Sequence, residues 1–173
     1  MAVSSDRLQL FVGDITKLEV DAVVNAANTS LRGGGGVDGA IHRAAGPALL
    51  EECLKIGGCP TGEARITKGH RLRAEWIIHA VGPVYRGGTH GEADLLANCY
   101  RASLQLAEGH GLNSIAFPCI STGIYGYPKS EACAIAVSTV LKWIALNAQP
   151  CRVIFCCFAE DDAEVYRNRL ADG

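Results

Sequence analysis

The sequence contains no apolar run long enough to cross a bilayer and no cluster of lysines and arginines. A membrane-spanning helix needs about 20 consecutive apolar residues, so we expect no membrane partner. The formal net charge of −2 gives no overall attraction for nucleic acid, and no local basic patch supplies one. A nucleic-acid partner is therefore not expected either. The first residues also lack the basic and apolar regions of a secretory signal, which favours a cytoplasmic location.

The eight cysteines show no C-x-x-C spacing, the arrangement that structural zinc sites commonly use. Most of them lie in apolar segments, where a free cysteine behaves as a small hydrophobic residue. We therefore predict buried free thiols in a reducing compartment, with no metal site and no cofactor. A catalytic thiol at Cys119 is disfavoured, because nothing in the sequence places a histidine beside it.

The phosphate-binding pattern G-x-x-x-x-G-K-S/T is also absent, and neither glycine-rich loop of the chain contains a lysine. Phosphoryl transfer driven by ATP is therefore disfavoured. The dinucleotide pattern G-x-G-x-x-G does occur at Gly34–Gly39. It carries little weight, because it arises from a run of glycines and lies well beyond the end of the preceding predicted strand.

That run of glycines, Gly33–Gly36, is the most informative feature of the sequence. Glycine carries the largest backbone ordering cost of any residue, so a core strand or helix would not use several in a row. A glycine loop can instead approach a ligand closely and point several N–H groups into one concavity, which binds anions. A helix is predicted to follow, with Asp38 at or near its N-cap, and its positive end would face the same anion.

A carboxylate beside a bound phosphate is unfavourable unless it has a task. Asp38 is therefore a candidate reacting group, either as a base or as a residue that positions water. The alternative is that Asp38 is only an N-cap. On spacing alone, Asn25 and Asn28 could likewise be side chains that cap a turn. His79 lies in an apolar segment, and a buried histidine with hydrogen-bond partners is favoured there over a catalyst.

Strand-like and helix-like segments alternate along the chain. The predicted strands are residues 7–12, 20–25, 62–69, 75–81, 114–118 and 152–158. One predicted helix begins near residue 38, and the other predicted helices are residues 48–56, 92–109, 129–147 and 160–170. This alternation predicts an α/β fold with a largely parallel sheet and helices on both faces, and the length of the chain predicts one domain over residues 1–173. Ligands of such sheets bind beyond the carboxyl ends of the strands. Two predicted strands lead into glycine-rich loops, so we expect one ligand to lie between these loops.

Several segments, in order along nearly the whole chain, resemble the MacroD-type branch of the macrodomain family. They are Gly13–Thr16, Val24–Asn28, Gly33–Gly46, Thr61–Gly62, Ile78–Pro83, Phe117–Pro118 and Ile120–Pro128. Each segment is weak evidence alone, but their joint order is specific. The resemblance implies a three-layer α/β/α macrodomain fold around a central mixed, mostly parallel sheet, with ADP-ribose as the ligand.

The resemblance also implies roles for individual residues. Asp14 and the Ile15 amide would hold the adenine, and Phe158 would stack on it, with a core position as the alternative for Phe158. Asn28 and Asp38 would lie at the distal ribose and act in catalysis. Two loops would enclose the diphosphate and the distal ribose, and their residues are Gly35, Gly36, Val37, Asp38, Ser121, Thr122, Gly123, Ile124, Tyr125 and Gly126.

The reaction that the resemblance implies is metal-independent hydrolysis of an ester on the distal ribose. The ester would be the acetyl group of O-acetyl-ADP-ribose or an acidic side chain of a mono-ADP-ribosylated protein. Asp38 would act as general base, or would position a water that a substrate phosphate deprotonates. The alternative is a non-catalytic ADP-ribose-binding reader module. The enzyme is favoured, because a reader has no use for a carboxylate near the diphosphate.

Overall fold

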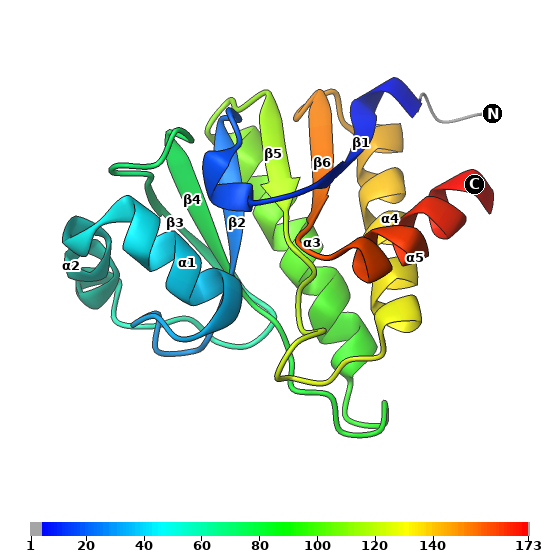
Figure 1. Cartoon of the computed structure of the whole chain (residues 1–173), viewed down its shortest axis with the longest axis horizontal. Helices are drawn as coiled ribbons and strands as arrows, with labels where there is room; N and C mark the ends of the chain where they lie inside the picture. Colours follow the sequence, from blue (N-terminus) through cyan, green and yellow to red (C-terminus); the bar gives the residue numbers. More distant parts are fainter. Residues whose placement is uncertain (1–4, 173) are drawn as a thin grey trace.

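The computed structural model describes residues 5–172, and in these residues it shows a six-stranded sheet with helices on both of its faces (Figure 1). The strands are β1 (Leu8–Val12), β2 (Ala22–Ala27), β3 (Ala64–Lys68), β4 (Trp76–Val81), β5 (Ser114–Phe117) and β6 (Arg152–Cys157). The helices are α1 (Gly36–Ala45), α2 (Pro47–Ile56), α3 (Glu92–Gly109), α4 (Lys129–Leu146) and α5 (Glu160–Asp172), with short 3-10 helices η1 (Ser5–Arg7) and η2 (Ile15–Lys17). The predicted α/β fold is confirmed.

The strand order is β1-β6-β5-β2-β4-β3, and every neighbouring pair is parallel except β3 with β4. The sheet is therefore mixed and mostly parallel. β2 lies in its interior and is buried almost throughout, which explains its near-continuous apolar sequence. Because the five parallel strands run in one direction, the loops that follow β1, β2, β4, β5 and β6 meet at the same edge of the sheet.

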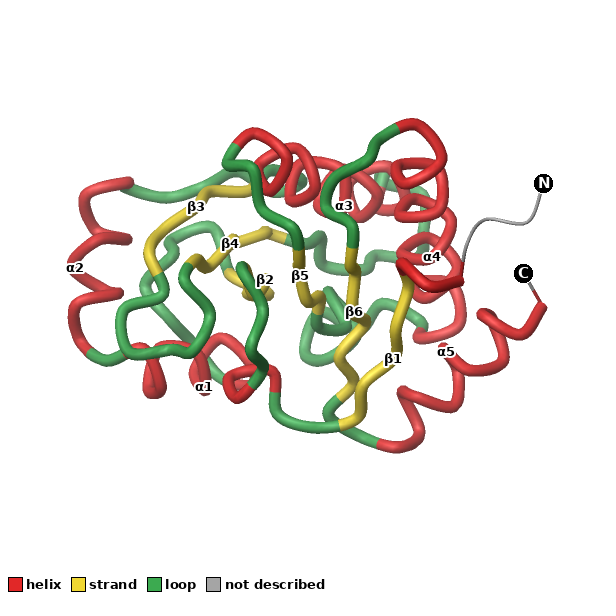
Figure 2. The backbone as a smooth tube through the Cα atoms, turned by 90° about the horizontal axis from the view of Figure 1, so that it is seen from above, coloured by secondary structure: helices red, strands yellow, loops and turns green. Residues whose placement is uncertain are grey.

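Helices cover the two faces of the sheet as separate layers. One buried cluster joins the sheet to α1 and α2, and a second joins its other face to α3, α4 and α5. In Figure 2, α3 and α4 lie on one side of the strands and α1 lies on the other. The arrangement is the three-layer α/β/α fold that the resemblance implied.

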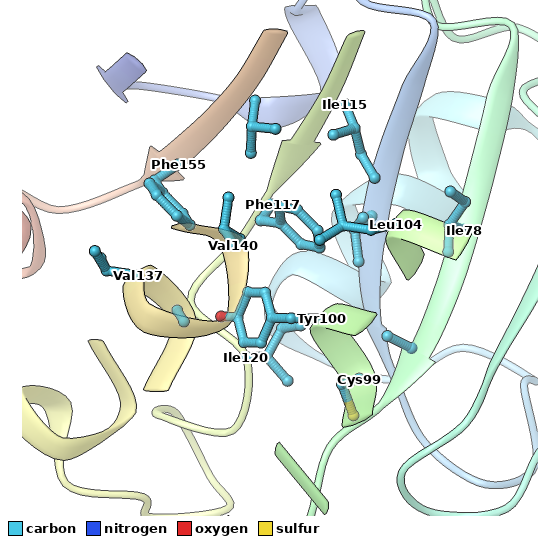
Figure 3. Close-up of a cluster of buried hydrophobic side chains, with 14 of the residues drawn as sticks. Ile78, Cys99, Tyr100, Leu104, Ile115, Phe117, Ile120, Val137, Val140 and Phe155 are labelled. Atoms are coloured by element: carbon cyan, nitrogen blue, oxygen red, sulfur yellow. The ribbon is translucent and has the colours of Figure 1, made fainter. Parts of the chain in front are cut away.

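The larger cluster is built around aromatic rings at the end of β5 (Figure 3). The ring of Phe117 lies 4.9 Å from that of Tyr100 on α3 and 6.4 Å from that of Phe155 on β6, measured between centroids. All three side chains are almost fully buried, and each contributes roughly 1.5–3 kcal/mol by burial. Phe117 is the last residue of β5, so this packing fixes the point from which the following loop departs.

Two predicted boundaries near the glycine run were wrong. The strand expected at residues 20–25 lies at Ala22–Ala27, so Asn25 is a buried strand residue and caps no turn. Its pairing with β4 continues to Ala27 opposite Val81, and such pairing between distant segments is not visible in local sequence. The next helix begins at Gly36 with Gly35 as its N-cap, and no side chain caps it. Asp38 lies inside the first turn, so the N-cap alternative for Asp38 was wrong.

None of the helices in residues 5–172 is both long enough and apolar enough to span a membrane. All eight cysteines are free thiols, and six of them are buried.

One buried carboxylate holds the loop between β4 and α3. Glu92 accepts hydrogen bonds from the backbone N–H groups of Arg86, Gly88 and His90, at 2.8, 2.9 and 2.5 Å. Burial acts to raise the pKa of Glu92, but these hydrogen bonds outweigh it and lower the pKa from 4.5 to about 2. The ionised carboxylate therefore stabilises the folded state.

This shift predicts how stability depends on pH. Because the folded-state pKa lies below the unfolded value, the contribution of Glu92 is complete above about pH 4.5 and is lost as the pH falls toward 2. Glu92→Gln should therefore lower the melting temperature at neutral pH, and the difference from wild type should shrink between these two pH values. Scanning calorimetry of both proteins from neutral pH down through this pH range measures the difference in melting temperature. Equal melting temperatures at neutral pH would show that the loop does not depend on the carboxylate.

Candidate active site

A cavity of about 720 Å³ opens at the carboxyl ends of the parallel strands. Its lining includes residues 13–15 after β1, 28 and 34–38 after β2, 82 after β4, 118–125 after β5 and 158 after β6. The volume lies within the range of small-molecule sites. Every ligand-binding candidate from the sequence lines this cavity except Gly126. Gly126 lies beside it and donates its N–H to the Gly123 carbonyl at 3.0 Å, which closes a turn.

Asp14 and Phe158 lie on the part of the wall formed by β1 and β6. Asp14 caps η2: the N–H and hydroxyl of Thr16 donate to its Oδ1 at 2.9 and 2.7 Å. The hydroxyl bond, followed by the N–H bond, lowers the pKa of Asp14, so the carboxylate is ionised. The Gly13 N–H donates to the Cys157 carbonyl at 2.9 Å and ties the two loops together. Phe158 is 84% exposed, so the alternative of a core position was wrong.

The N-terminus of α1 forms the second part of the wall. The Gly39 N–H donates to the Gly35 carbonyl at 3.2 Å, which marks the start of the helical bonds. The N–H groups of Gly36, Val37 and Asp38 precede that point and have no acceptor within the helix. All three residues line the cavity. This wall therefore has the geometry of an anion site, with backbone donors and the positive end of the helix dipole.

The loop after β5 forms the opposite wall and is held by backbone hydrogen bonds. The Ser121 carbonyl accepts from the Tyr127 N–H at 2.9 Å, and the Tyr125 carbonyl accepts from the Tyr85 N–H at 2.8 Å. A Cβ on Gly82 would lie 2.2 Å from the Ser121 hydroxyl oxygen, so only glycine permits β4 to end this close to the loop. Ile124, at the tip, is 96% exposed.

Asp38 is buried where β2 and α1 meet the cavity, with 5% of its surface exposed. Its Oδ1 accepts a hydrogen bond from Asn25 Nδ2 at 2.8 Å and lies 3.5 Å from His42 Nε2. Burial raises the pKa of Asp38, while the Asn25 hydrogen bond and His42 act in the opposite direction. A carboxylate whose pKa is raised toward neutrality is a better base than an ordinary aspartate.

The side chains of Asn28 and Asp38 both lie beside Gly34. A Cβ on Gly34 would lie 3.3 Å from Asp38 Oδ2 and 3.6 Å from Asn28 Nδ2, so the missing side chain leaves room between the two groups. Asn28 also holds its own turn, accepting from the Leu31 N–H at 3.1 Å and donating to the Gly33 carbonyl at 3.0 Å. The turn-capping role is confirmed, and it places the amide on the cavity wall.

Among the residues that sequence reasoning did not place in the site, three lie beside Asp38 or carry charge into the cavity. Asn25 bonds directly to Asp38, His42 lies beside it, and Arg43 lines the cavity. The position of His42 could have been predicted, because residues four apart lie on the same face of a helix. The contact of Asn25 depends on the packing of α1 against β2, which sequence spacing does not reveal.

The remaining alternatives find no support in the geometry. Cys119 lines the cavity, but its Sγ contacts Cys157 Sγ at 3.7 Å, and no histidine is among its hydrogen-bond partners in the described residues. His79 is a fully buried histidine with hydrogen-bond partners, as predicted. Across residues 5–172, no three histidine, cysteine or acidic side chains lie close enough together to hold a metal ion.

The sequence matches the family described as Macro domain over residues 24–136. The O-acetyl-ADP-ribose deacetylase of Salmonella gallinarum is 56% identical over 170 residues, which cover 96% of this chain and 95% of the relative. The ADP-ribose glycohydrolase MACROD2 of Mus musculus is 55% identical over 170 residues, which cover 96% of this chain but only 35% of the relative. A solved variant of the Oceanobacillus iheyensis macrodomain with ADPR is 45% identical, with a TM-score of 0.93 over 99% of this chain and 96% of that one.

Proposed function

This chain belongs to the macrodomain family, and from that premise we propose that it is a MacroD-type hydrolase that cleaves esters on the distal ribose of ADP-ribose. The observation that carries the proposal is the buried carboxylate of Asp38, on the same wall as the N-terminus of α1. The helix N-terminus suits the diphosphate, and the carboxylate suits the chemistry beside it. The names of two relatives more than 50% identical to this chain support this assignment.

ADP-ribose would lie along the cavity from Asp14 to Asp38. The free oxygen of the Asp14 carboxylate accepts a hydrogen bond from the adenine amino group, and the Ile15 amide donates a hydrogen bond to a ring nitrogen. Phe158 stacks on the adenine ring. The amides of Gly36 and Val37 face the diphosphate, and the loop after β5 covers it from the opposite wall. No metal is needed, because backbone donors and the helix dipole supply the positive potential.

The distal ribose then lies against Asn28 and Asp38. Asp38 Oδ1 is occupied by Asn25, so Oδ2, near Asn28, is the oxygen that holds the attacking water. The water oxygen adds to the ester carbonyl carbon as the water gives one proton to Asp38 or to a substrate phosphate. The bond between the carbonyl carbon and the ribose oxygen then breaks, and the same group returns that proton to the ribose oxygen, which leaves as a hydroxyl.

The substrates are O-acetyl-ADP-ribose and proteins that carry mono-ADP-ribose on an acidic side chain. Ile124, at the tip of the loop that encloses the distal part of the ligand, is exposed at the cavity rim, which is compatible with entry of an ester that is still linked to a protein. The deacetylase name of one relative supports the free substrate, and the glycohydrolase name of the MACROD2 relative supports ADP-ribose as the group that the cavity holds.

The test is to incubate the protein, in the presence of a chelator, with O-acetyl-ADP-ribose and with a protein carrying glutamate-linked mono-ADP-ribose. Mass spectrometry should show free ADP-ribose and acetate from the first, and free ADP-ribose with an unmodified glutamate from the second. A protein that binds ADP-ribose but cleaves neither ester would be a reader and not a hydrolase. Loss of binding in the chelator would contradict the metal-free site.

The adenine assignment gives a separate prediction at Asp14. Asp14→Ala should weaken ADP-ribose binding by roughly 1–3 kcal/mol, the range for losing a hydrogen bond to a charged group. Calorimetry measures this change. Since alanine also removes the cap of η2, Asp14→Asn is the matched variant: it keeps an oxygen that Thr16 can bond, but it removes the charge.

Thr16→Val is the control for the cap, because it removes one hydrogen bond to Asp14 and leaves the carboxylate in place. We expect its affinity for ADP-ribose to remain near that of wild type. Unchanged affinity in Asp14→Ala would place the adenine elsewhere in the cavity.

A further inference from the structure

A row of buried polar side chains extends from Asp38 across three strands of the sheet. Asn25 lies on β2, His79 lies opposite it on β4, and Thr67 lies beyond on β3. The distance from Asn25 Nδ2 to His79 Nδ1 is 3.1 Å, and the distance from His79 Nε2 to Thr67 Oγ1 is 2.9 Å. All three side chains are at most 1% exposed. Polar groups at this depth are costly unless each hydrogen bond has the correct donor and acceptor.

The two ends of the row agree on one direction for its hydrogen bonds. The amide nitrogen of Asn25 can only donate to His79 Nδ1, which leaves the hydrogen of the neutral ring on Nε2. Thr67 Oγ1 then accepts from His79 Nε2 at 2.9 Å and is free to donate its own hydrogen to the Lys68 carbonyl at 3.2 Å. Burial, with a smaller effect from His42, lowers the pKa of His79 to about 3, so the ring is neutral. With its hydrogen on Nε2, the ring presents a lone pair at Nδ1.

That lone pair determines how Asn25 is turned. The amide nitrogen carries two hydrogens, and one goes to His79 Nδ1 while the other goes to Asp38 Oδ1 at 2.8 Å. If the amide were rotated by half a turn, its oxygen would face a carboxylate and a lone pair, which are both acceptors. The rotated state is therefore strongly disfavoured as long as His79 keeps its hydrogen on Nε2.

We propose that His79 and Thr67 are positioning residues for Asp38: they fix the direction of the hydrogen bonds through Asn25, so that an N–H group always faces the carboxylate. The inference rests on the proposed function, since it assigns the row to the hydrolytic step. An N–H at Oδ1 stabilises the ionised carboxylate, which burial opposes, and leaves Oδ2 directed at the water. Neither His79 nor Thr67 lines the cavity, so each acts through Asn25.

Two other titratable groups face the row. His42 on α1 lies 3.5 Å from Asp38 Oδ1, and the thiol of Cys53 on α2 lies 4.0 Å from His79 Nε2. Burial, with smaller effects from Glu52 and Asp38, raises the pKa of Cys53 to about 11, so the thiol is neutral at physiological pH. Both residues are kept in every variant below, so a shift in the titration of Asp38 reports on the row itself.

The first experiment compares His79→Leu with His79→Asn. Leucine removes the acceptor that faces Asn25, whereas asparagine offers a side-chain oxygen near the position of Nδ1. Single-turnover cleavage of O-acetyl-ADP-ribose at saturating enzyme should fall about 10- to 100-fold in His79→Leu, the range for a displaced catalytic group. The dissociation constant for ADP-ribose should stay unchanged, and His79→Asn should recover part of the rate.

The pH profile gives a readout that a merely structural role would not move. The rate should fall as the pH drops through the pKa of Asp38, because the protonated carboxyl cannot hold the water in the same way. In His79→Leu the Asn25 amide loses one of the two acceptors that orient it, so its N–H is held less firmly at Asp38 Oδ1 and the pKa of Asp38 rises further. The acid limb of the profile should therefore shift to higher pH, and His79→Asn should move it back.

The second experiment uses Thr67, in case removal of the imidazole prevents folding. Thr67→Val is nearly isosteric but leaves His79 Nε2 without its acceptor, so the ring can carry its hydrogen on Nδ1 and turn the amide of Asn25. Its rate should fall in the same direction with the same shift of the acid limb, and Thr67→Ser, which keeps the hydroxyl, should recover the rate. Imidazole nitrogen shifts in NMR spectra should show the hydrogen of His79 on Nε2 in the wild type.

Wild-type rates and an unmoved acid limb in both His79→Leu and Thr67→Val would overturn the inference. A wild-type protein that cleaves neither ester would instead overturn the proposed function. The carboxyl titration of Asp38, followed by carbon NMR, then decides the inference alone. A pKa of Asp38 that is raised in Thr67→Val but not in Thr67→Ser supports the row as its positioning device, and equal values in both overturn it.

Discussion

Replacing Asp38 with alanine should lower the single-turnover rate of ester cleavage by a factor on the order of 10²–10⁴, the usual contribution of a positioned acid–base group. ADP-ribose binding should survive the change. Product affinity should even rise, because the substitution removes a negative charge beside the amides of α1 that face the diphosphate. Rapid-quench kinetics with O-acetyl-ADP-ribose and calorimetry with ADP-ribose measure the two effects separately.

Stability does not account for an effect of this size. Gly35, and not Asp38, is the N-cap of α1, so the substitution removes no capping bond. Alanine leaves an Asn25 N–H without its acceptor, which costs about 1–3 kcal/mol, and removes a favourable interaction with the helix dipole of about 0.3–1 kcal/mol, whereas loss of the buried charge acts in the opposite direction. We therefore expect a lower melting temperature in a protein that is still folded at the assay temperature. Asp38→Asn, which keeps the shape but not the charge, is the matched control for packing and should be nearly as slow as the alanine variant.

Asn28 provides the test of whether the two residues act on one water. Asn28→Ala should also reduce turnover. Part of that effect comes from loosening the turn that the asparagine holds. If both side chains position the same water, the double variant should be little slower than the slower single variant. Multiplicative effects would mean separate roles. An Asp38→Ala protein that cleaves both esters at the wild-type rate would refute the catalytic assignment.

Much of the fold could be predicted from local sequence, because its signals are local. The alternation of apolar runs with helical spacing predicted every strand and α-helix within a few residues. The glycine loops pointed to the correct edge of the sheet, since the carboxyl ends of parallel strands meet there.

What sequence could not give are the contacts that depend on strand pairing. Asn25 faces His79 only because β2 pairs with β4 in that register, and it reaches Asp38 only because α1 packs on β2. Phe158 is a residue whose exposure, and not its burial, could not be predicted from local sequence. It continues the apolar run of β6, yet the chain leaves the sheet after Cys157, so the ring lies at the cavity rim and not in the core.

A glutamate at position 35 should abolish ADP-ribose binding at ordinary ligand concentrations. Gly35 has the extended backbone angles φ −91° and ψ −173°, and a Cβ placed there meets no atom within 4 Å. A side chain therefore fits without strain and extends into the cavity, where the N-terminus of α1 faces the diphosphate. Like charges placed together at an interface cost several kcal/mol, so Gly35→Glu should weaken binding by about 10²-fold or more.

Gly35→Ala is the matched control, because it adds the Cβ without the charge. Alanine at a glycine position with compatible angles stabilises a protein by roughly 0.4–1 kcal/mol through the unfolded chain, but alanine is a poorer N-cap than glycine by a similar amount, so its melting temperature should stay near that of wild type. Gly39 gives the contrast within the same helix: a Cβ there would lie 2.5 Å from the Gly34 carbonyl oxygen, so Gly39→Ala should distort the loop and destabilise the fold.

Calorimetry over a range of salt concentrations separates the effect of side-chain bulk from the effect of charge, because only the electrostatic part of the Gly35→Glu defect should diminish as salt is added. If Gly35→Glu folded normally and bound ADP-ribose as tightly as Gly35→Ala, the diphosphate would not lie at this helix N-terminus, and the placement of the ligand along the cavity would have to be abandoned.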